Sequence, residues 1–562
     1  MTAPFRRRTL IKAAGAALSA LPLRGFAVTE TRPVHFTHHV ASGDPLADRV
    51  MLWTRLLPGD GAMRAVRCRW EIATTAEFTT LIASGTATAT PERDYTVKVD
   101  AQGLEPGQSY CYRFVAEGVT SPVGCTRTLP VGDVSEFKLG VASCSNYPQG
   151  FFHAYREMAK AELDAILHLG DYIYEYPVGE YVNPAVEQAY GRQVTPEHEL
   201  LVLEDYRMRY GLYRSDPDLQ AAHAAHPWIT VWDDHEIMND TWREGAENHN
   251  EGEGDFAARV RAARQAYHEW LPIRPPAEGD QGVIYRSFQI GNLADLIMLD
   301  TRLIGRDQQL SYLRDLKPED DVHEFLQKRL NTSKRTLLGK PQEEWLARQL
   351  ASSQKRGAVW QVLGQQVLMG KLSIPEIPAD ALASMTLSDY NRARVESAQQ
   401  LAPLGLPLNL DAWDGYPAAR TRLYRALLKS ASNPISLAGD THNGWAFNLA
   451  DNKGKAVGVE IGTPGVSSPG LETYLPMPSN EMASLLLESS PELAAVDTAQ
   501  RGWTEMTLTP DAMTSQWCFV SSVASPTYTT TTGSLMECRA GARKLSYPRA
   551  HVGSALADSI VR

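Results

Sequence analysis

The sequence lacks several features that mark large classes of protein. Beyond Ala27 no apolar run approaches the roughly 18 residues that a membrane span needs, so we expect no transmembrane segment in the mature chain. The 6 cysteines include no C-x-x-C pair, which excludes zinc ribbons and thioredoxin-like redox sites. H-E-x-x-H, a P-loop and G-x-G-x-x-G are also missing, which excludes zincins, P-loop nucleotide hydrolases and dinucleotide-binding enzymes.

What is present instead is the composition of a large globular protein. The chain has 562 residues, of which 43% are hydrophobic and 22% charged, and this balance excludes disordered, collagenous and coiled-coil chains. The formal net charge of −11 becomes −16 when the five basic residues of positions 1–27 are removed. An acidic protein repels phosphate backbones, so we expect no nucleic-acid partner in a stable complex. Bound metal ions can still reverse the sign of the charge locally.

The first 27 residues have the pattern of an export signal. A basic segment precedes an apolar stretch at Ala13–Leu23, and small residues at Gly25 and Ala27 suit cleavage by a signal peptidase. Residues 7–12 spell R-R-T-L-I-K, which resembles a twin-arginine (Tat) signal for the export of folded proteins. An ordinary secretory signal or a basic amphipathic helix is the alternative. The pattern predicts a Tat signal peptide over 1–27, the Tat machinery as a partner, and a periplasmic or secreted protein.

The body of the chain changes character near residue 130. Over 34–130, short alternating β-type runs are separated by turn residues, which predicts an N-terminal β-sandwich domain. Over 135–530, apolar β-type runs alternate with helical patterns, which predicts an α/β catalytic domain of layered sheets and helices. Residues 531–562 form a C-terminal segment, which we hypothesise to act as a lid from Ser534 onward. The long segment Tyr172–Arg214 is predicted to be a loop over the site.

Polar residues of metal-ligand type follow the ends of four predicted strands. Cys144 follows the run 138–142, Asp171 follows 163–169, Asp234 follows 228–232 and Asp440 follows 434–438. Ligands of open α/β sheets bind beyond the carboxyl ends of the strands, so distant residues converge there. The acidic cluster at 233–236 would repel itself unless cations neutralise it. Each motif alone also fits a helix-capping turn, a charged surface loop or a buried cysteine, but the four together favour a metal site.

These motifs resemble those of a known enzyme family. Along the chain they are A-S-G-D-P at 41–45, L-W-T-R at 52–55, A-S-C-S at 142–145, H-L-G-D-Y-I-Y-E at 168–175, W-D-D-H-E at 232–236, L-D-T-R at 299–302 and A-G-D-T-H at 438–442. The chain thereby resembles the alkaline phosphatase D family of PhoD-like metallophosphatases, which includes some phospholipase D enzymes. The resemblance implies an α/β (α+β layered) calcineurin-like metallophosphatase sandwich with an N-terminal Ig/fibronectin-like β-sandwich domain. It also implies an Fe3+ and Ca2+ site that hydrolyses phosphate esters.

The residue types support a mixed metal site with two different positions. The first would combine a thiolate, a phenolate, a carboxylate and an imidazole, a set suited to oxidised iron. Its candidate ligands are Cys144, Asp171, Tyr174 and His442. The second has only oxygen donors, which favours Ca2+ or another hard cation and argues against zinc at both positions. Its candidate ligands are Asp171 as a bridge, Asp234 and Asp440.

Two such ions would activate a water for in-line attack on phosphorus, so the reaction needs no protein nucleophile. Asp234 is expected to serve catalysis as well as metal binding. His235 beside it is our candidate general acid for the leaving oxygen, and an orienting role is its alternative. Asn239 and Asn443 are candidates for contacts to the substrate phosphate or for support of the ligands.

The phosphate clamp is less well specified. Some members of the family are thought to place an arginine shortly after the tyrosine ligand, but this chain has Y-E-Y-P-V-G at 174–179. Arg302 is a substitute candidate for substrate binding, and a structural salt bridge is the alternative.

The sequence thus predicts an exported phosphoesterase acting on small phosphate mono- or diesters, with a phospholipase D-type phosphodiesterase as the alternative on the same scaffold. A serine hydrolase is disfavoured, because the nearest candidate, Gly465–Gly470, does not fit G-x-S-x-G. A secreted binding module with structural metals is the remaining alternative, which the absence of turnover on any aryl phosphate would favour.

Overall fold

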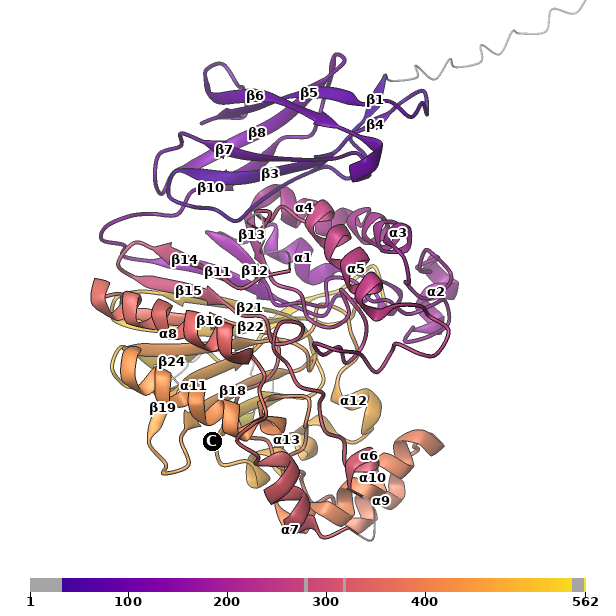
Figure 1. Ribbon diagram of the computed structural model, residues 1–562, viewed down its shortest axis with the longest axis vertical. Helices are drawn as coiled ribbons and strands as arrows, with labels where there is room; N and C mark the ends of the chain where they lie inside the picture. Colours follow the sequence, from indigo (N-terminus) through magenta and orange to yellow (C-terminus); the bar gives the residue numbers. More distant parts are fainter. Residues whose placement is uncertain (1–32, 277–281, 317–319, 548–559, 562) are drawn as a thin grey trace, which may run out of the picture.

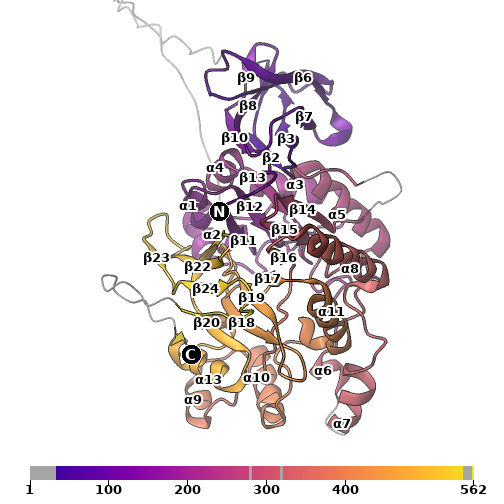
Figure 2. The same cartoon turned by 90° about the vertical axis from the view of Figure 1, so that its left-hand side faces the viewer.

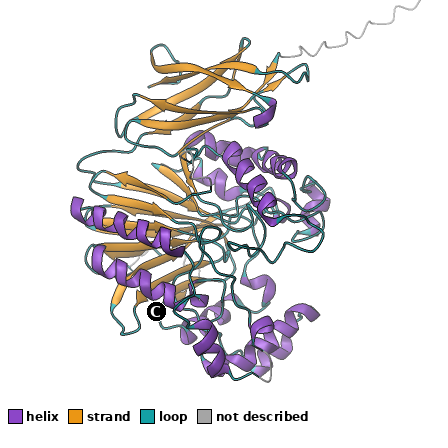
Figure 3. Ribbon diagram, in the orientation of Figure 1, coloured by secondary structure: helices purple, strands orange, loops and turns teal. Residues whose placement is uncertain are grey.

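The computed structural model describes residues 33–276, 282–316, 320–547 and 560–561. The predicted Tat signal peptide over 1–27 lies outside these ranges. Two large sheets are stacked on each other, and helices cover their outer faces (Figures 1 and 3). Among the described residues, no helix combines the length and the hydropathy that crossing a membrane requires. The predicted mixed α/β fold is therefore confirmed.

The first sheet has 10 strands in the order β23-β22-β21-β11-β12-β13-β2-β3-β7, with β24 paired to β22. β11, β12, β13 and β2 run parallel. Every residue of β12 and β13 is buried, as expected for parallel strands covered on both faces. The strands are β2 (Val40–Gly43), β3 (Arg49–Arg55), β7 (Thr96–Gln102), β11 (Phe137–Ala142), β12 (Ala165–His168), β13 (Pro227–Thr230), β21 (Arg501–Leu508), β22 (Ala512–Val520), β23 (Thr530–Thr532) and β24 (Met536–Arg539).

The second sheet has 8 strands in the order β14-β15-β16-β17-β19-β18-β20-β25. β15, β16, β17 and β19 run parallel, and the flanking pairs are antiparallel. The strands are β14 (Arg286–Ile290), β15 (Ala294–Met298), β16 (Trp360–Gly364), β17 (Asn433–Ala438), β18 (Gly444–Ala450), β19 (Ala456–Gly462), β20 (Leu493–Asp497) and β25 (Ile560–Val561).

The main hydrophobic core lies between the two sheets. Val141 and Trp228 of the first sheet share one buried cluster with Val362 and Leu437 of the second. On the outer face of the second sheet, α8 and α11 pack side by side (Figure 2). α1, α3, α4 and α5 accompany the first sheet. The helices are α1 (His153–Met158), α2 (Pro184–Tyr190), α3 (Leu203–Arg214), α4 (Pro217–Ala225), α5 (Phe256–Trp270), α6 (Tyr312–Asp315), α7 (Val322–Phe325), α8 (Gly339–Arg356), α9 (Ala379–Ser384), α10 (Asp389–Leu401), α11 (Pro417–Ser430), α12 (Leu471–Tyr474) and α13 (Ser479–Ser489).

The N-terminal strands form two facing layers with a core of their own. β5 (Val66–Ala73), β6 (Leu81–Ala89), β8 (Ser109–Ala116), β9 (Val119–Thr120) and β10 (Gly124–Arg127) make one layer opposite β2, β3 and β7, while β1 (Val34–His35) pairs with β4 (Leu57–Pro58). One sheet crosses the predicted boundary near residue 130, because Ser42 in β2 pairs with Pro227 in β13. The Ig/fibronectin-like topology and the domain limits stay predictions.

The predicted loop over 172–214 is wrong in part, since it contains α2 and the 12-residue helix α3. The buried face of α3 is made of Tyr206, Tyr210 and Tyr213, which recur at helical spacing without forming an aliphatic stripe. Because these buried residues are tyrosines and not aliphatic residues, a count of aliphatic residues does not reveal the helical period.

The described part of the C-terminal segment lies away from the candidate site. Gly541 donates its backbone N–H to Asn433 Oδ1 at 2.6 Å, and Arg543 donates to the carbonyl oxygen of Ala431 at 2.6 Å. Both acceptors stand where β17 begins, whereas Asp440 follows the end of that strand. Positions 548–559 and 562 lie outside the described residues, and the lid stays a hypothesis.

Candidate metal centre and active site

The predicted ligands meet where the parallel strands of both sheets end. Cys144, Asp171 and Asp234 follow β11, β12 and β13, while Asp440 and His442 follow β17 of the facing sheet. Four of these five residues have left-handed backbone, with φ of 61° at Cys144, 57° at Asp171, 63° at Asp440 and 65° at His442. Such conformations cost free energy in residues other than glycine and collect at functional sites. The turns therefore hold the side chains at a cost to local stability.

One group of ligand atoms has the composition expected of a transition-metal site. Ligand atoms of Cys144, Asp171 and His442 all lie within 4.8 Å of one another. The Tyr174 hydroxyl donates to Asp171 Oδ2 at 2.9 Å and lies 3.3 Å from His442 Nε2. His442 Nδ1 lies 2.6 Å from the Pro469 carbonyl oxygen, to which it donates, so Nε2 is left with a free lone pair. This tautomer suits metal binding through Nε2.

The surroundings of the Cys144 thiol disfavour the thiolate. The side chain is fully buried, and burial, followed by the charge of Asp171, raises the pKa of the thiol well above its ordinary value. A bound cation would reverse this balance, because a coordinated thiol is deprotonated outright. The donor set therefore fits a metal ion better than it fits an apolar core.

A second group consists of carboxylates. Ligand atoms of Asp233, Asp234 and Asp440 lie within 4.8 Å of one another, and Asp234 also groups with Asp171 and His235. Asp171 Oδ1, Asp233 Oδ2 and Asp234 Oδ1 are buried without a hydrogen-bond partner among the described residues. Buried carboxylate oxygens of this kind are costly unless a cation binds them. The oxygens left over thus fit a hard cation such as Ca2+.

Arg302 lies inside this carboxylate group. Its guanidinium is fully buried, donates to Asp233, and donates at 2.8 Å to Asp411 Oδ2 and at 2.9 Å to Asp440 Oδ1. The structure therefore favours the salt-bridge alternative over a phosphate clamp, because each of the three guanidinium nitrogens already donates to a carboxylate. Arg306 extends the network through its own ion pair to Asp411.

His235 is held by a buried carboxylate that the sequence analysis assigned no role. Its Nδ1 lies 2.7 Å from Glu175 Oε2, while Glu175 Oε1 accepts from the backbone N–H of Asn239 at 2.7 Å and from Asn248 Nδ2 at 2.9 Å. Burial opposes protonation of His235, but the charges of Glu175 and nearby aspartates outweigh it and raise its pKa well above the ordinary value. The imidazole is thus positioned with Nε2 free and with a preference for its protonated form.

Each of the two predicted asparagines has a hydrogen-bond partner within the protein. The side chain of Asn239 donates to Glu247 Oε2 at 2.9 Å. Asn443 is fully buried, and its Oδ1 accepts the backbone N–H of Leu471 at 2.8 Å. The described contacts therefore favour a supporting role for both.

Glu236 is a further residue that sequence analysis missed. Its carboxylate accepts backbone N–H groups from Asp171 at 3.0 Å, Tyr172 at 2.7 Å and Asp233 at 2.8 Å. It therefore ties the ligand turn after β12 to the ligand turn after β13. Its place in the W-D-D-H-E motif could have marked Glu236 as functional. Which backbone N–H groups its carboxylate accepts could not be known without the path of the backbone.

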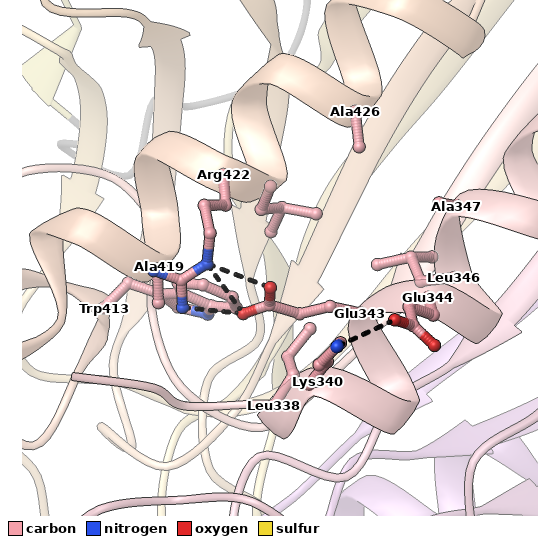
Figure 4. A pocket seen from close by; sticks show the side chains of 11 residues that line it. Leu338, Lys340, Glu343, Glu344, Leu346, Ala347, Trp413, Ala419, Arg422 and Ala426 are labelled. Atoms are coloured by element: carbon pink, nitrogen blue, oxygen red, sulfur yellow. Dashed lines mark hydrogen bonds and ion pairs between the residues drawn. The ribbon is translucent and has the colours of Figure 1, made fainter. Parts of the chain in front are cut away.

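A hollow elsewhere on the molecule carries no comparable chemistry. It has a volume of about 360 Å3 and lies between α8 and α11 (Figure 4). Arg422 and Glu343 face each other there at 2.8 Å, and Lys340 and Glu344 at 3.8 Å. The metal-ligand groups found among the described residues include none of its lining residues, and the candidate site remains the one at the strand ends.

Comparison with known proteins identifies the family of the chain. The family model described as "PhoD-like phosphatase" matches residues 139–517, and "PhoD-like phosphatase, N-terminal domain" matches residues 22–130. The chain belongs to the PhoD-like phosphatase family. The predicted family is therefore confirmed, as is its assignment as a phosphate-ester hydrolase.

Two proteins of the PhoD type and one more distant phosphatase resemble this chain to different degrees. Alkaline phosphatase D of Bacillus subtilis (strain 168) is 38% identical over 450 residues, which are 77% of this chain and 70% of that protein. A solved structure described as PhoD has 34% identity and a TM-score of 0.76 over 92% of both chains. A purple acid phosphatase from yellow lupin seeds has a TM-score of 0.50 at 12% identity, over 89% of this chain and 74% of its own, which shows a shared fold alone.

Proposed function

We propose that this chain is an exported, metal-dependent phosphoesterase that hydrolyses small phosphate mono- and diesters at a mixed Fe3+ and Ca2+ site. The observation that carries the proposal is the meeting of two donor groups through shared carboxylates. One group offers sulfur, nitrogen and oxygen, whereas the other offers mainly carboxylate oxygen, so two different cations suit them. No match in the comparisons favours the phospholipase D-type alternative.

The residues named above would hold the ions. Cys144, Asp171, Tyr174 and His442 would hold iron, while Asp171, Asp234 and Asp440 would hold calcium. When bound, such a pair of ions polarises phosphoryl oxygens and lowers the pKa of a water. Asp233 is a further oxygen donor beside the second position, but its contact with Arg302 leaves only Oδ2 free for a cation.

The chain's own groups then provide orientation and a proton. Burial opposes protonation of His235, but the charges of Glu175 and nearby aspartates favour the doubly protonated ring. Nδ1–H then donates to Glu175, and the Nε2 proton can be delivered to the leaving oxygen. Arg302 offsets the charge of the aspartates and keeps Asp440 and Asp233 in place. Glu236 holds both ligand turns through three backbone N–H groups.

Export through the Tat pathway is the second part of the proposal. It rests on R-R-T-L-I-K at 7–12 and on the need to load metal before translocation, which export in the folded state permits. Replacing both Arg7 and Arg8 by lysine should leave the protein in the cytoplasm, as measured by activity in cell fractions. Equal export of this variant would remove the Tat assignment.

The metal assignment is tested on the purified exported protein without added metal. We expect about one iron per chain together with calcium, and loss of phosphatase activity on chelation. Cys144→Ser should lower the iron content and activity together. Cys538→Ser is the matched control, since Cys538 is also buried but lies in β24. Two zinc or manganese ions per chain, or full activity without metal, would refute the mixed site.

A further inference from the structure

A cluster of tyrosines continues from His235 toward the molecular surface. The ring of Tyr176 lies 5.4 Å from His235 and 5.5 Å from Tyr181, between ring centroids. Tyr181 lies 5.6 Å from Tyr174. Both Tyr176 and Tyr181 are partly exposed, and Tyr474 beside Tyr181 is 44% exposed. We call Tyr176, Tyr181 and Tyr474 the tyrosine cluster.

The backbone around Tyr181 and Tyr474 is anchored by polar contacts. The carbonyl oxygen of Tyr181 accepts from Asn146 Nδ2 at 2.9 Å. Tyr474 ends α12, whose first residue is tied to Asn443 Oδ1 by the backbone N–H of Leu471 at 2.8 Å. An anchored backbone lowers the conformational entropy that is lost when a ligand packs on the side chains that it carries.

The segment that carries Tyr474 is also tied to the metal-ligand turn. Arg501 donates both to the His442 carbonyl oxygen and to Glu472 in α12. Pro469, just before α12, accepts from His442 Nδ1 at 2.6 Å. The backbone of α12, which carries Tyr474, is therefore tied to the turn that holds His442.

The position of the tyrosine cluster determines which part of a substrate it meets. A proton from His235 goes to the oxygen of the departing alcohol, so that alcohol lies on the His235 side of phosphorus. Tyr176 is in ring contact with His235, and Tyr181 and Tyr474 follow it outward. Aromatic faces bind planar rings by stacking, with little dependence on the identity of the ring.

We propose that the tyrosine cluster is a subsite for the leaving group and that the preferred substrates are phosphate esters of alcohols carrying a planar ring, such as aryl or nucleoside groups. This inference rests on the proposed function, because it uses His235 as the acid for the leaving oxygen. It adds a substrate class, which the family match does not supply.

The test compares two substrates on the metal-loaded enzyme. Phenyl phosphate supplies a planar ring, and a fluorinated alkyl phosphate with an alcohol of matched acidity supplies none. We expect Tyr474→Ala to lower kcat/KM for phenyl phosphate by about 3- to 10-fold and to leave the alkyl ester within about 2-fold. Tyr474→Phe, which keeps the ring, should behave as the wild type. Tyr190→Ala is the control, because Tyr190 is 45% exposed on α2 and packs on Phe151.

The outcomes distinguish a failure of the leaving-group subsite from a failure of the proposed function. Equal effects of Tyr474→Ala on both esters, or none on either, would overturn the leaving-group subsite while the phosphatase activity stands. Hydrolysis of neither ester by the metal-loaded wild type would overturn the proposed function and the subsite together. A selective loss with the aryl ester, absent in Tyr190→Ala, supports the subsite.

Discussion

Replacing His235 by glutamine should slow the reaction only when the leaving group needs a proton. The 2.7 Å contact with Glu175 fixes Nδ1 of the protonated ring, so Nε2 is the atom that gives up a proton, and the amide of glutamine is too weak an acid to replace it. General acid catalysis contributes about 10²- to 10⁴-fold to a rate. For p-methoxyphenyl phosphate, a poor leaving group, we expect kcat/KM to fall at least about 100-fold, or about 2.7 kcal/mol in the activation free energy.

The same substitution should cost much less with p-nitrophenyl phosphate, since nitrophenolate departs without protonation. Both esters carry a ring, so the tyrosine cluster affects them alike. The assay is the slope of log kcat/KM against leaving-group acidity, with metal content measured in parallel. His249→Gln is the control, because His249 also faces a glutamate, Glu253, at 3.7 Å. Equal losses on both esters, or loss of a bound metal in His235→Gln, would refute the role of general acid.

Three further predictions concern charge. Glu175→Gln removes the carboxylate that raises the pKa of His235, so the alkaline limb of the pH profile of kcat/KM should move to lower pH, and an unmoved limb would contradict the pairing. Arg302→Met leaves Asp233 unpaired, so urea unfolding of the metal-free protein should show a loss of about 3–5 kcal/mol, whereas unchanged stability would argue against the buried network. Burial lowers the pKa of Lys98 from 10.5 to about 7. Burying the charged side chain therefore destabilises the fold, and this cost is absent above pH 10.5 and complete below pH 7. Lys98→Met should therefore stabilise the fold more at about pH 6 than at about pH 9.5, and an equal effect at both would contradict the shift.

The meeting of the candidate ligands could be predicted because their positions follow a local rule. A short apolar run followed by an acid, a cysteine or a histidine marks the end of a parallel strand, and the structure brings Cys144, Asp171 and His442 together from three such ends. The fold class followed from the same alternation of strands and helices. Neither inference needed the path of the loops.

Two kinds of feature could not be predicted: the orientation of individual side chains, and a strand whose residues have little β preference. Whether Arg302 faces substrate or carboxylates, and which N–H groups Glu236 accepts, is decided by loops that pack from distant parts of the chain. The residues of β6, Leu81–Ala89, are mostly Ala, Thr, Ser and Gly and do not by themselves predict a strand, so β6 is a strand through its pairing with β5. Pairing of this kind overrides weak local preference.

The parallel pairing of β2 with β13 has a consequence for how the protein can be divided. Trp228 and Gly43 are partners across this junction, and Trp53 in β3 donates its indole N–H to the Glu269 carbonyl oxygen at 2.8 Å. Removing the N-terminal layers would leave β13, the strand before Asp234, as an open edge that invites pairing with another chain. We therefore expect the catalytic region 135–530 to aggregate when it is produced alone. In the intact chain, we expect this region and the N-terminal region 34–130 to unfold as one cooperative unit. The N-terminal region therefore completes the first sheet of the catalytic fold and is not a detachable module.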